Sequence, residues 1–369
     1  MTQLSEQEQV RRENLARIRE LGIDPYPPVH YKVNAFAADI KKNYEEGAEG
    51  YTEVCLAGRL MMKRVMGKAS FAELQDSSGR IQLYVMRDEI CPEEDKTLYN
   101  TLFKKLLDIG DFIGVKGYVF VTKMGETTIY VQELILLSKS LKPLPVVKKK
   151  TDPDTGETKI YDAFTDPDLR YRQRYVDLVV NPQYREIFLA RASVIREMRA
   201  FFDEQGWLEV ETPILQPIHG GAAARPFVTH HNTLDMELYL RIANELYLKR
   251  LVAGGYDGVY EIGKMFMNEG MDRTHNPEFT SMEIYVAYKD YEWMMEMVEQ
   301  LLFRIANAVL GQSAATVGEH QIDFTPPFRR LSMKEAIKTY TGVDITGMDE
   351  SALRQVCKEL GVEVDPSMG

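Results

Sequence analysis

The sequence lacks any apolar run that approaches the roughly 20 residues of a membrane-spanning helix, so we expect no membrane partner. The first residues are polar and charged rather than apolar, and we therefore expect no secretory signal. Cysteine is scarce as well, because Cys55, Cys91 and Cys357 are scattered without the spacing of a metal site or a disulfide framework. Together these absences predict a cytoplasmic protein.

Positive charge is also in deficit, since 45 Lys and Arg stand against 56 Asp and Glu, for a net charge of −11. This balance argues against a general nucleic-acid coat protein. It does not exclude a protein that meets RNA on one patch, because binding there depends on the local field. A length of 369 residues with 44% hydrophobic residues predicts a soluble chain with two domains.

The stretch 260–288 predicts two strands joined by a polar loop. Alternation places Met282, Ile284 and Val286 on an apolar face that should lie on a core. The opposite face combines carboxylates, a phenol, a phenyl ring and methionines: Glu261, Met265, Met267, Phe279, Glu283 and Tyr285. Because an unpaired buried carboxylate costs several kcal/mol, burying this much charge needs a reason.

Residues 51–140 contain short alternating strands, with one helix expected between the third and the fourth. Five strands with this helix predict an OB-fold barrel. The turn at 76–79 should close a hairpin that places Phe71 opposite Tyr84 on the outward face. An exposed phenyl ring beside polar residues is typical of a surface on which bases stack, although both rings could merely cap the barrel.

The second half of the chain alternates between helical patterns and short strands. Helices are expected at 183–205, within 241–255, at 290–311 and, as two short ones, within 331–362. Pro213 interrupts a strand, and Gly220 and Gly221 lie in a loop where a backbone could approach closely or simply turn.

The hairpin resembles motif 2 of the class II aminoacyl-tRNA synthetases in the lysyl version, through THNPEFT at 274–280 and MEIYVAY at 282–288. The helix at 183–205 with the strand and proline that follow it resembles motif 1, which implies a homodimer. The resemblance implies that lysine is joined to tRNA(Lys) in two steps, with ATP as co-substrate and Mg²⁺ as cofactor.

The barrel resembles the anticodon-binding domain of the aspartyl, asparaginyl and lysyl enzymes, with Arg64, Phe71 and Gln82 as the anticodon-reading set.

The N-terminal helix at 4–21 either lies solvated on a neighbour or touches tRNA. The arginines concerned are Arg11, Arg12, Arg17 and Arg19. In the linker-like stretch 141–175, the run 148–150 of three lysines is either a solvated loop or a phosphate contact.

The fold implied is of the α+β class with two domains. An all-β OB-fold barrel precedes a class II synthetase catalytic domain, which is built on an antiparallel sheet and is expected to be incomplete at its C-terminal end. The expected segments are an N-terminal helical extension at 1–50, the anticodon-binding domain at 51–145, a linker at 146–175 and the catalytic core at 176–369.

The resemblance also implies a role for each residue of the site. The lysine site comprises Gly221, Ala222, Glu245, Glu283 and Tyr285. The ATP site comprises Glu269, Arg273, His275, Asn276 and Phe279, with Phe279 stacking on the adenine. Glu269 and His275 are the expected catalytic residues, together with the position of Met267.

Two departures from the family pattern bear on activity. Met267 stands where the family has the arginine that grips the α-phosphate and the amino-acid carboxylate. A Gly-rich motif 3 with its arginine, and the family's magnesium-binding acids, do not occur before Gly369. We therefore expect a chain that is inactive or nearly so, since one lost phosphate-clamping donor costs about 10²–10³ in rate.

The chemistry of the hairpin favours lysine over aspartate or asparagine. A cationic substrate needs carboxylates and a phenol oxygen, which Glu245, Glu283 and Tyr285 supply, whereas an aspartate site needs a Lys or Arg. The alternatives are an aspartyl or asparaginyl enzyme of the same subclass and a tRNA-binding paralogue without ligase activity. Met267 favours the paralogue.

Overall fold

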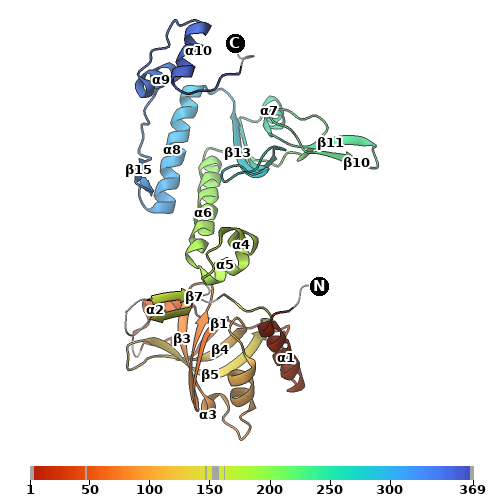
Figure 1. Ribbon diagram of the computed structural model, residues 1–369, viewed down its shortest axis with the longest axis vertical. Helices are drawn as coiled ribbons and strands as arrows, with labels where there is room; N and C mark the ends of the chain where they lie inside the picture. The colour runs from red at the N-terminus through yellow and green to blue at the C-terminus, as the bar shows by residue number, and fades with distance from the viewer. Residues whose placement is uncertain (1–3, 46–47, 146–147, 152–157, 162, 366–369) are drawn as a thin grey trace. The chain divides into compact units, whose positions relative to one another are not determined.

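A computed structural model describes the chain except for residues 1–3, 46–47, 146–147, 152–157, 162 and 366–369. The chain divides into two compact units, residues 1–185 and 186–369. Unit 1 contains a closed barrel and unit 2 contains the hairpin that resembles motif 2, as Figure 1 shows. The predicted domain boundaries at 50, 145 and 175 stay predictions.

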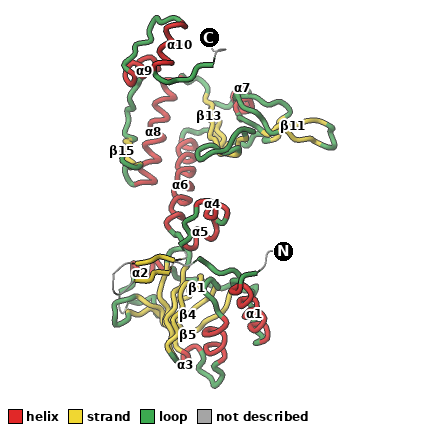
Figure 2. Tube along the Cα trace, in the orientation of Figure 1, coloured by secondary structure: helices red, strands yellow, loops and turns green. Residues whose placement is uncertain are grey.

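Unit 1 is built on five strands that close into a barrel in the order β1-β2-β3-β5-β4, drawn in yellow in Figure 2. Their bounds are β1 Val54–Met66, β2 Ala69–Gln75, β3 Arg80–Met86, β4 Phe112–Val121 and β5 Thr127–Ser138. Alternate residues fill the interior, and Leu74, Ile81 and Leu83 are fully buried. The predicted five-stranded OB-fold barrel is therefore confirmed.

Short helices surround the barrel: α1 Glu6–Glu20, α2 Ala37–Asn43, α3 Arg87–Ile90 and the π-helix η1 Leu98–Leu106. Ser5 begins α1, since its side chain accepts a hydrogen bond from the Glu8 amide. Arg11 of this helix is buried and donates to the carbonyls of Ile109 and Ser140 at 2.7 and 3.1 Å. It therefore anchors α1 to unit 1, whereas Arg12, Arg17 and Arg19 are exposed.

The lysine run at 148–150 lies in a strand rather than in the loop that its charge predicted. Strand β6, Lys148–Thr151, pairs antiparallel with β7, Thr158–Tyr161. Two short helices follow, α4 Pro167–Arg172 and α5 Arg174–Val180. Regular backbone pairing thus occupies part of the stretch expected to be a linker.

Unit 2 contains most of α6, Gln183–Glu204, and a three-stranded sheet in the order β13-β12-β8. After α6, the elements of unit 2 have these bounds: β8 Leu208–Glu209, β9 Leu215–Gln216, β10 Val228–His231, β11 Met236–Leu240, α7 Glu245–Ala253, β12 Gly258–Phe266, β13 Glu278–Val286, α8 Tyr291–Leu310, β14 Ala314–Val317, β15 His320–Asp323, α9 Met333–Thr341 and α10 Glu350–Glu359. The strand expected on both sides of Pro213 is present only as β8 and β9.

The apolar face of the hairpin lies on a core, as predicted. Phe202 of α6, Tyr260 of β12 and Leu301 of α8 are buried in one cluster. Met282 and Ile284 pack against this cluster from β13. The register pairs Glu261 with Glu283, so both carboxylates point to the opposite face.

Candidate functional site

The site face of the hairpin rests on a buried ion pair between Glu261 of β12 and Arg241, which follows β11. Their side chains are 5% and 2% exposed, and Arg241 Nη1 lies 2.6 Å from Glu261 Oε1. Glu261 Oε2 also accepts hydrogen bonds from Thr212 Oγ1 at 2.6 Å and Asn244 Nδ2 at 3.1 Å. Glu261 is therefore structural, and the cation that offsets its burial comes from outside the hairpin.

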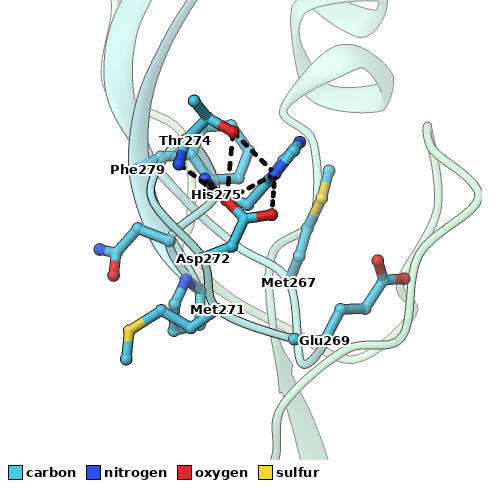
Figure 3. A pocket seen from close by; sticks show the side chains of 10 residues that line it. Met267, Glu269, Met271, Asp272, Thr274, His275 and Phe279 are labelled. Atoms are coloured by element: carbon cyan, nitrogen blue, oxygen red, sulfur yellow. Dashed lines mark hydrogen bonds and ion pairs between the residues drawn. The ribbon is translucent and has the colours of Figure 1, made fainter.

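The loop of the hairpin lines a cavity of about 420 Å³ (Figure 3). Of the residues predicted to bind ATP or to act in catalysis, the structure brings together at this cavity Met267, Glu269, His275, Asn276 and Phe279. Arg273 belongs to the same loop but is not among the lining residues. The volume lies within the range of small-molecule sites, about 300–1,000 Å³.

Asp272 fixes the shape of the loop around the cavity. Its carboxylate accepts hydrogen bonds from the amides of Thr274 and His275, each at 2.7 Å. The His275 ring nitrogen Nδ1 lies 2.8 Å from the same carboxylate, as Figure 3 shows. These contacts, the Thr274 amide first, lower the pKa of Asp272 to about 2. The imidazole of His275 is thus held by Asp272 at the cavity.

A second cluster forms where α7 lies against β13 and gathers the acidic residues predicted to bind lysine. Tyr285 donates to Glu283 Oε2 at 3.1 Å, and burial together with Glu283 and Glu245 raises the pKa of Tyr285. The ammonium of Lys249 pairs with Glu245 and lies 5.9 Å from the centre of the Tyr285 ring. Glu245 at the edge of the cluster is therefore already paired with the ammonium of a largely exposed lysine.

Lys249 was missed by the sequence analysis, although its spacing could have identified it. Glu245 and Lys249 are four residues apart on α7, a separation at which opposite charges on a helix pair.

Gly221 lies beside the same cluster, and its backbone explains why glycine is needed. Its φ of +86° is a conformation that other residues rarely adopt. A methyl group built there would lie 3.0 Å from Ala243 Cβ and 3.2 Å from Glu245 Cβ. The loop therefore lies close to Glu245, and Ala222 is exposed next to it.

The three predicted anticodon residues lie on adjacent strands of one barrel face. Arg64 of β1 pairs with Phe71 of β2, and Phe71 pairs with Tyr84 of β3 with ring centres 5.1 Å apart. Gln82, two residues before Tyr84, accepts a hydrogen bond from Thr128 Oγ1 at 2.8 Å. A cation, a ring and an amide therefore share one outward surface.

Within the described ranges, no three His, Cys, Asp or Glu side chains converge to form a metal site. Across the part of the chain that the structure describes, no helix has the length and apolar character needed to cross a bilayer.

Comparison with protein families gives two matches, one within unit 1 and one that begins in unit 1 and covers most of unit 2. The family described as tRNA synthetases class II (D, K and N) matches residues 166–361. The family described as OB-fold nucleic acid binding domain matches residues 54–137. The first match covers more than half of the chain.

Curated relatives carry one common name. Proteins named Lysine--tRNA ligase from Porphyromonas gingivalis and Christiangramia forsetii are each 61% identical over all 369 residues, which cover 63% of their length. One from Azobacteroides pseudotrichonymphae is 55% identical over 365 residues, covering 99% of this chain and 72% of the relative. The chain thus spans just under two thirds of the length of the first two relatives.

Proposed function

The chain belongs to the class II tRNA synthetases of the D, K and N type, and on that premise we propose that it acts as a lysine–tRNA ligase. The observation that supports lysine is the cluster of Glu245, Glu283 and Tyr285. A substrate ammonium there would replace Lys249 on Glu245, exchanging one cation for another. An aspartate side chain would instead face two carboxylates, which disfavours it strongly.

An aspartate-specific enzyme of the subclass needs a cation at the side-chain site, and Arg241 is the buried candidate among the described residues of unit 2. Its guanidinium is already bonded to Glu261, to the Lys264 carbonyl at 2.9 Å and to Thr212. Because its Nε and Nη1 atoms already bind Glu261, Lys264 and Thr212, Arg241 is committed to these partners and does not serve an acidic substrate. This supports lysine over aspartate.

ATP would occupy the hairpin cavity in this proposal. Phe279 offers a ring for the adenine, and Glu269 and Asn276 offer polar atoms for its edge. His275, oriented by Asp272, faces the phosphates, and Arg273 could reach the γ-phosphate from outside the lining. The family uses ATP with Mg²⁺.

The proposed reaction has two steps. A lysine carboxylate oxygen attacks the α-phosphorus of ATP, forming lysyl-adenylate as pyrophosphate leaves. A terminal hydroxyl of tRNA(Lys) then attacks the lysyl carbonyl carbon, and AMP leaves. Positioning and charge neutralisation drive both steps. Met267 carries no charge and cannot neutralise the phosphate, so we propose that the activity of this chain is impaired.

The remaining proposals concern location and partners. Arg64, Phe71 and Gln82 would read the anticodon on the barrel. Two chains would form a homodimer through α6 and the strand that follows, in the cytoplasm. Met267 supports one further candidate, a tRNA-binding paralogue that does not catalyse the reaction.

Exchange of labelled pyrophosphate into ATP tests the proposal, measured with lysine, aspartate and asparagine separately. We expect slow exchange that depends on lysine alone, in the natural chain and more clearly in Met267→Arg. Exchange with aspartate or asparagine but not lysine would identify an enzyme of the alternative specificity. No exchange in either protein would favour the non-catalytic paralogue.

A further inference from the structure

A continuous row of side chains crosses the outward face of the barrel from β1 to β4. The register pairs Arg64 with Phe71, Phe71 with Tyr84, Tyr84 with Tyr130, and Tyr130 with Tyr118. The row therefore begins with a guanidinium and continues with one aromatic ring on each of four neighbouring strands. Strand spacing makes the aromatic part about 14 Å long.

The rings along this row are in contact with one another. Ring centres are 5.1 Å apart for Phe71 and Tyr84, 5.6 Å for Tyr84 and Tyr130, and 4.8 Å for Tyr130 and Tyr118. The last two rings are nearly parallel, with 12° between their planes. Phe120 lies beside the row, 6.1 Å from Tyr130. The surface is thus one aromatic strip, which we call the aromatic row.

The aromatic row does not belong to the barrel core. The interior is filled by the alternate residues, such as Leu83, Ile129 and Val119, which are buried. Tyr84, Tyr118 and Tyr130, in contrast, keep part of their surface exposed. Cross-strand aromatic pairs stabilise a sheet, which explains two neighbouring rings. Stabilisation of the sheet does not require an aromatic ring on each of four neighbouring strands, with an arginine at the end of the row.

We infer that the base-stacking surface does not end at Phe71 but continues to Tyr118 and Tyr130, where it provides a second stacking position for single-stranded RNA. The inference rests on the proposed function, in which Phe71 stacks a base of the anticodon loop. Aromatic residues on a four-stranded sheet can stack two or three bases, so the row is long enough for both positions.

The charge at the far end of the row indicates how this second position is used. Glu89 of α3 is close enough to Tyr118 and Tyr130 to add to the effect of burial in raising the pKa of both phenols. A carboxylate there disfavours phosphate. RNA would therefore approach this end with the face of a base, and its backbone would lie nearer to Arg64.

Binding of oligouridylates to the full chain, followed by fluorescence anisotropy, tests the inference. Heptauridylate can cover both stacking positions, whereas diuridylate, with two adjacent bases, is too short to reach both ends of a row about 14 Å long. Tyr118→Leu should weaken heptauridylate binding by about tenfold, the typical effect of one lost base stack. It should leave diuridylate binding at Phe71 unchanged, and Tyr118→Phe should bind both as the natural chain does.

Two further variants separate stacking from folding. Phe112→Leu removes an exposed ring from the same strand outside the aromatic row and should bind both oligonucleotides normally. Tyr130→Leu should reproduce Tyr118→Leu if the latter does not fold. If Tyr118→Leu or Tyr130→Leu binds heptauridylate normally while Phe71→Leu binds it more weakly, the second stacking position is overturned. The stacking role proposed for Phe71 would then still stand. No binding by the natural chain would overturn the RNA-binding role of the barrel as well.

Discussion

Replacing Arg241 by methionine should destabilise unit 2 more than any surface substitution in it. The change removes the charged partner of Glu261 while keeping a side chain of similar length. Glu261 would remain buried with only two neutral donors, Thr212 and Asn244, at 2.6 and 3.1 Å. A buried ion pair that loses one partner typically costs about 3–5 kcal/mol, and we expect Arg241→Met to fall in that range.

The chain offers a fluorescence signal that is confined to this unit. Its two tryptophans, Trp207 and Trp293, both belong to the core of unit 2. Urea unfolding followed by tryptophan emission therefore reports the free energy of unfolding of unit 2 without interference from the barrel. The midpoint and the slope should be fitted separately, since a changed slope would indicate a populated intermediate.

A double variant distinguishes the ion pair from a simple loss of packing. Arg241→Met with Glu261→Gln leaves no buried charge, so it should be more stable than either single variant. The coupling between the two sites should be about 2–3 kcal/mol. As a matched control, Arg199→Met breaks the exposed pair of Arg199 with Glu209 and should cost less than about 1 kcal/mol. An Arg241→Met cost as small as the control's, with additive single effects, would refute the reasoning.

Two other predictions concern catalysis and pH. Met267→Arg should raise lysine-dependent exchange of pyrophosphate into ATP by about 10²–10³, because it restores a phosphate-binding donor; an unchanged rate would contradict the role given to that position. Burial lowers the pKa of Lys63 from 10.5 to about 8. The folded state therefore releases this proton first, and the unfolding free energy of the natural chain, measured by circular dichroism, should rise relative to that of Lys63→Met between pH 8 and 10.5. A constant difference would show that Lys63 is not buried.

Elements defined by local periodicity could be predicted from the sequence. The alternating strands and the turn at 76–79 correctly placed Phe71 opposite Tyr84 on the outward face of the barrel. It also identified the two faces of the β12–β13 hairpin. These features depend on neighbouring residues and on a period of two, which a sequence displays directly.

Features that depend on contacts between distant residues could not be predicted in this way. Arg241 lies 20 positions before Glu261, and nothing local indicates that the two side chains meet. Arg11 belongs to a helix whose polar sequence suggests a solvated face, yet its side chain donates to the carbonyl of Ile109, 98 positions away. In the candidate site, the resemblance located Glu245 and Glu283, but the structure was needed to show that the Tyr285 hydroxyl donates to Glu283 beside the Lys249–Glu245 pair.

The central claim is that Glu245 and Glu283 form a site for an ammonium-bearing substrate, and calorimetric titration with free lysine tests it most directly. Glu245→Gln and Glu283→Gln should each weaken lysine binding by about 10–100-fold, since a hydrogen bond to a charged group is lost. Glu278→Gln, on the same strand but exposed and paired with Lys264, should bind lysine as the natural chain does. Equal affinity in all four proteins would contradict the claim.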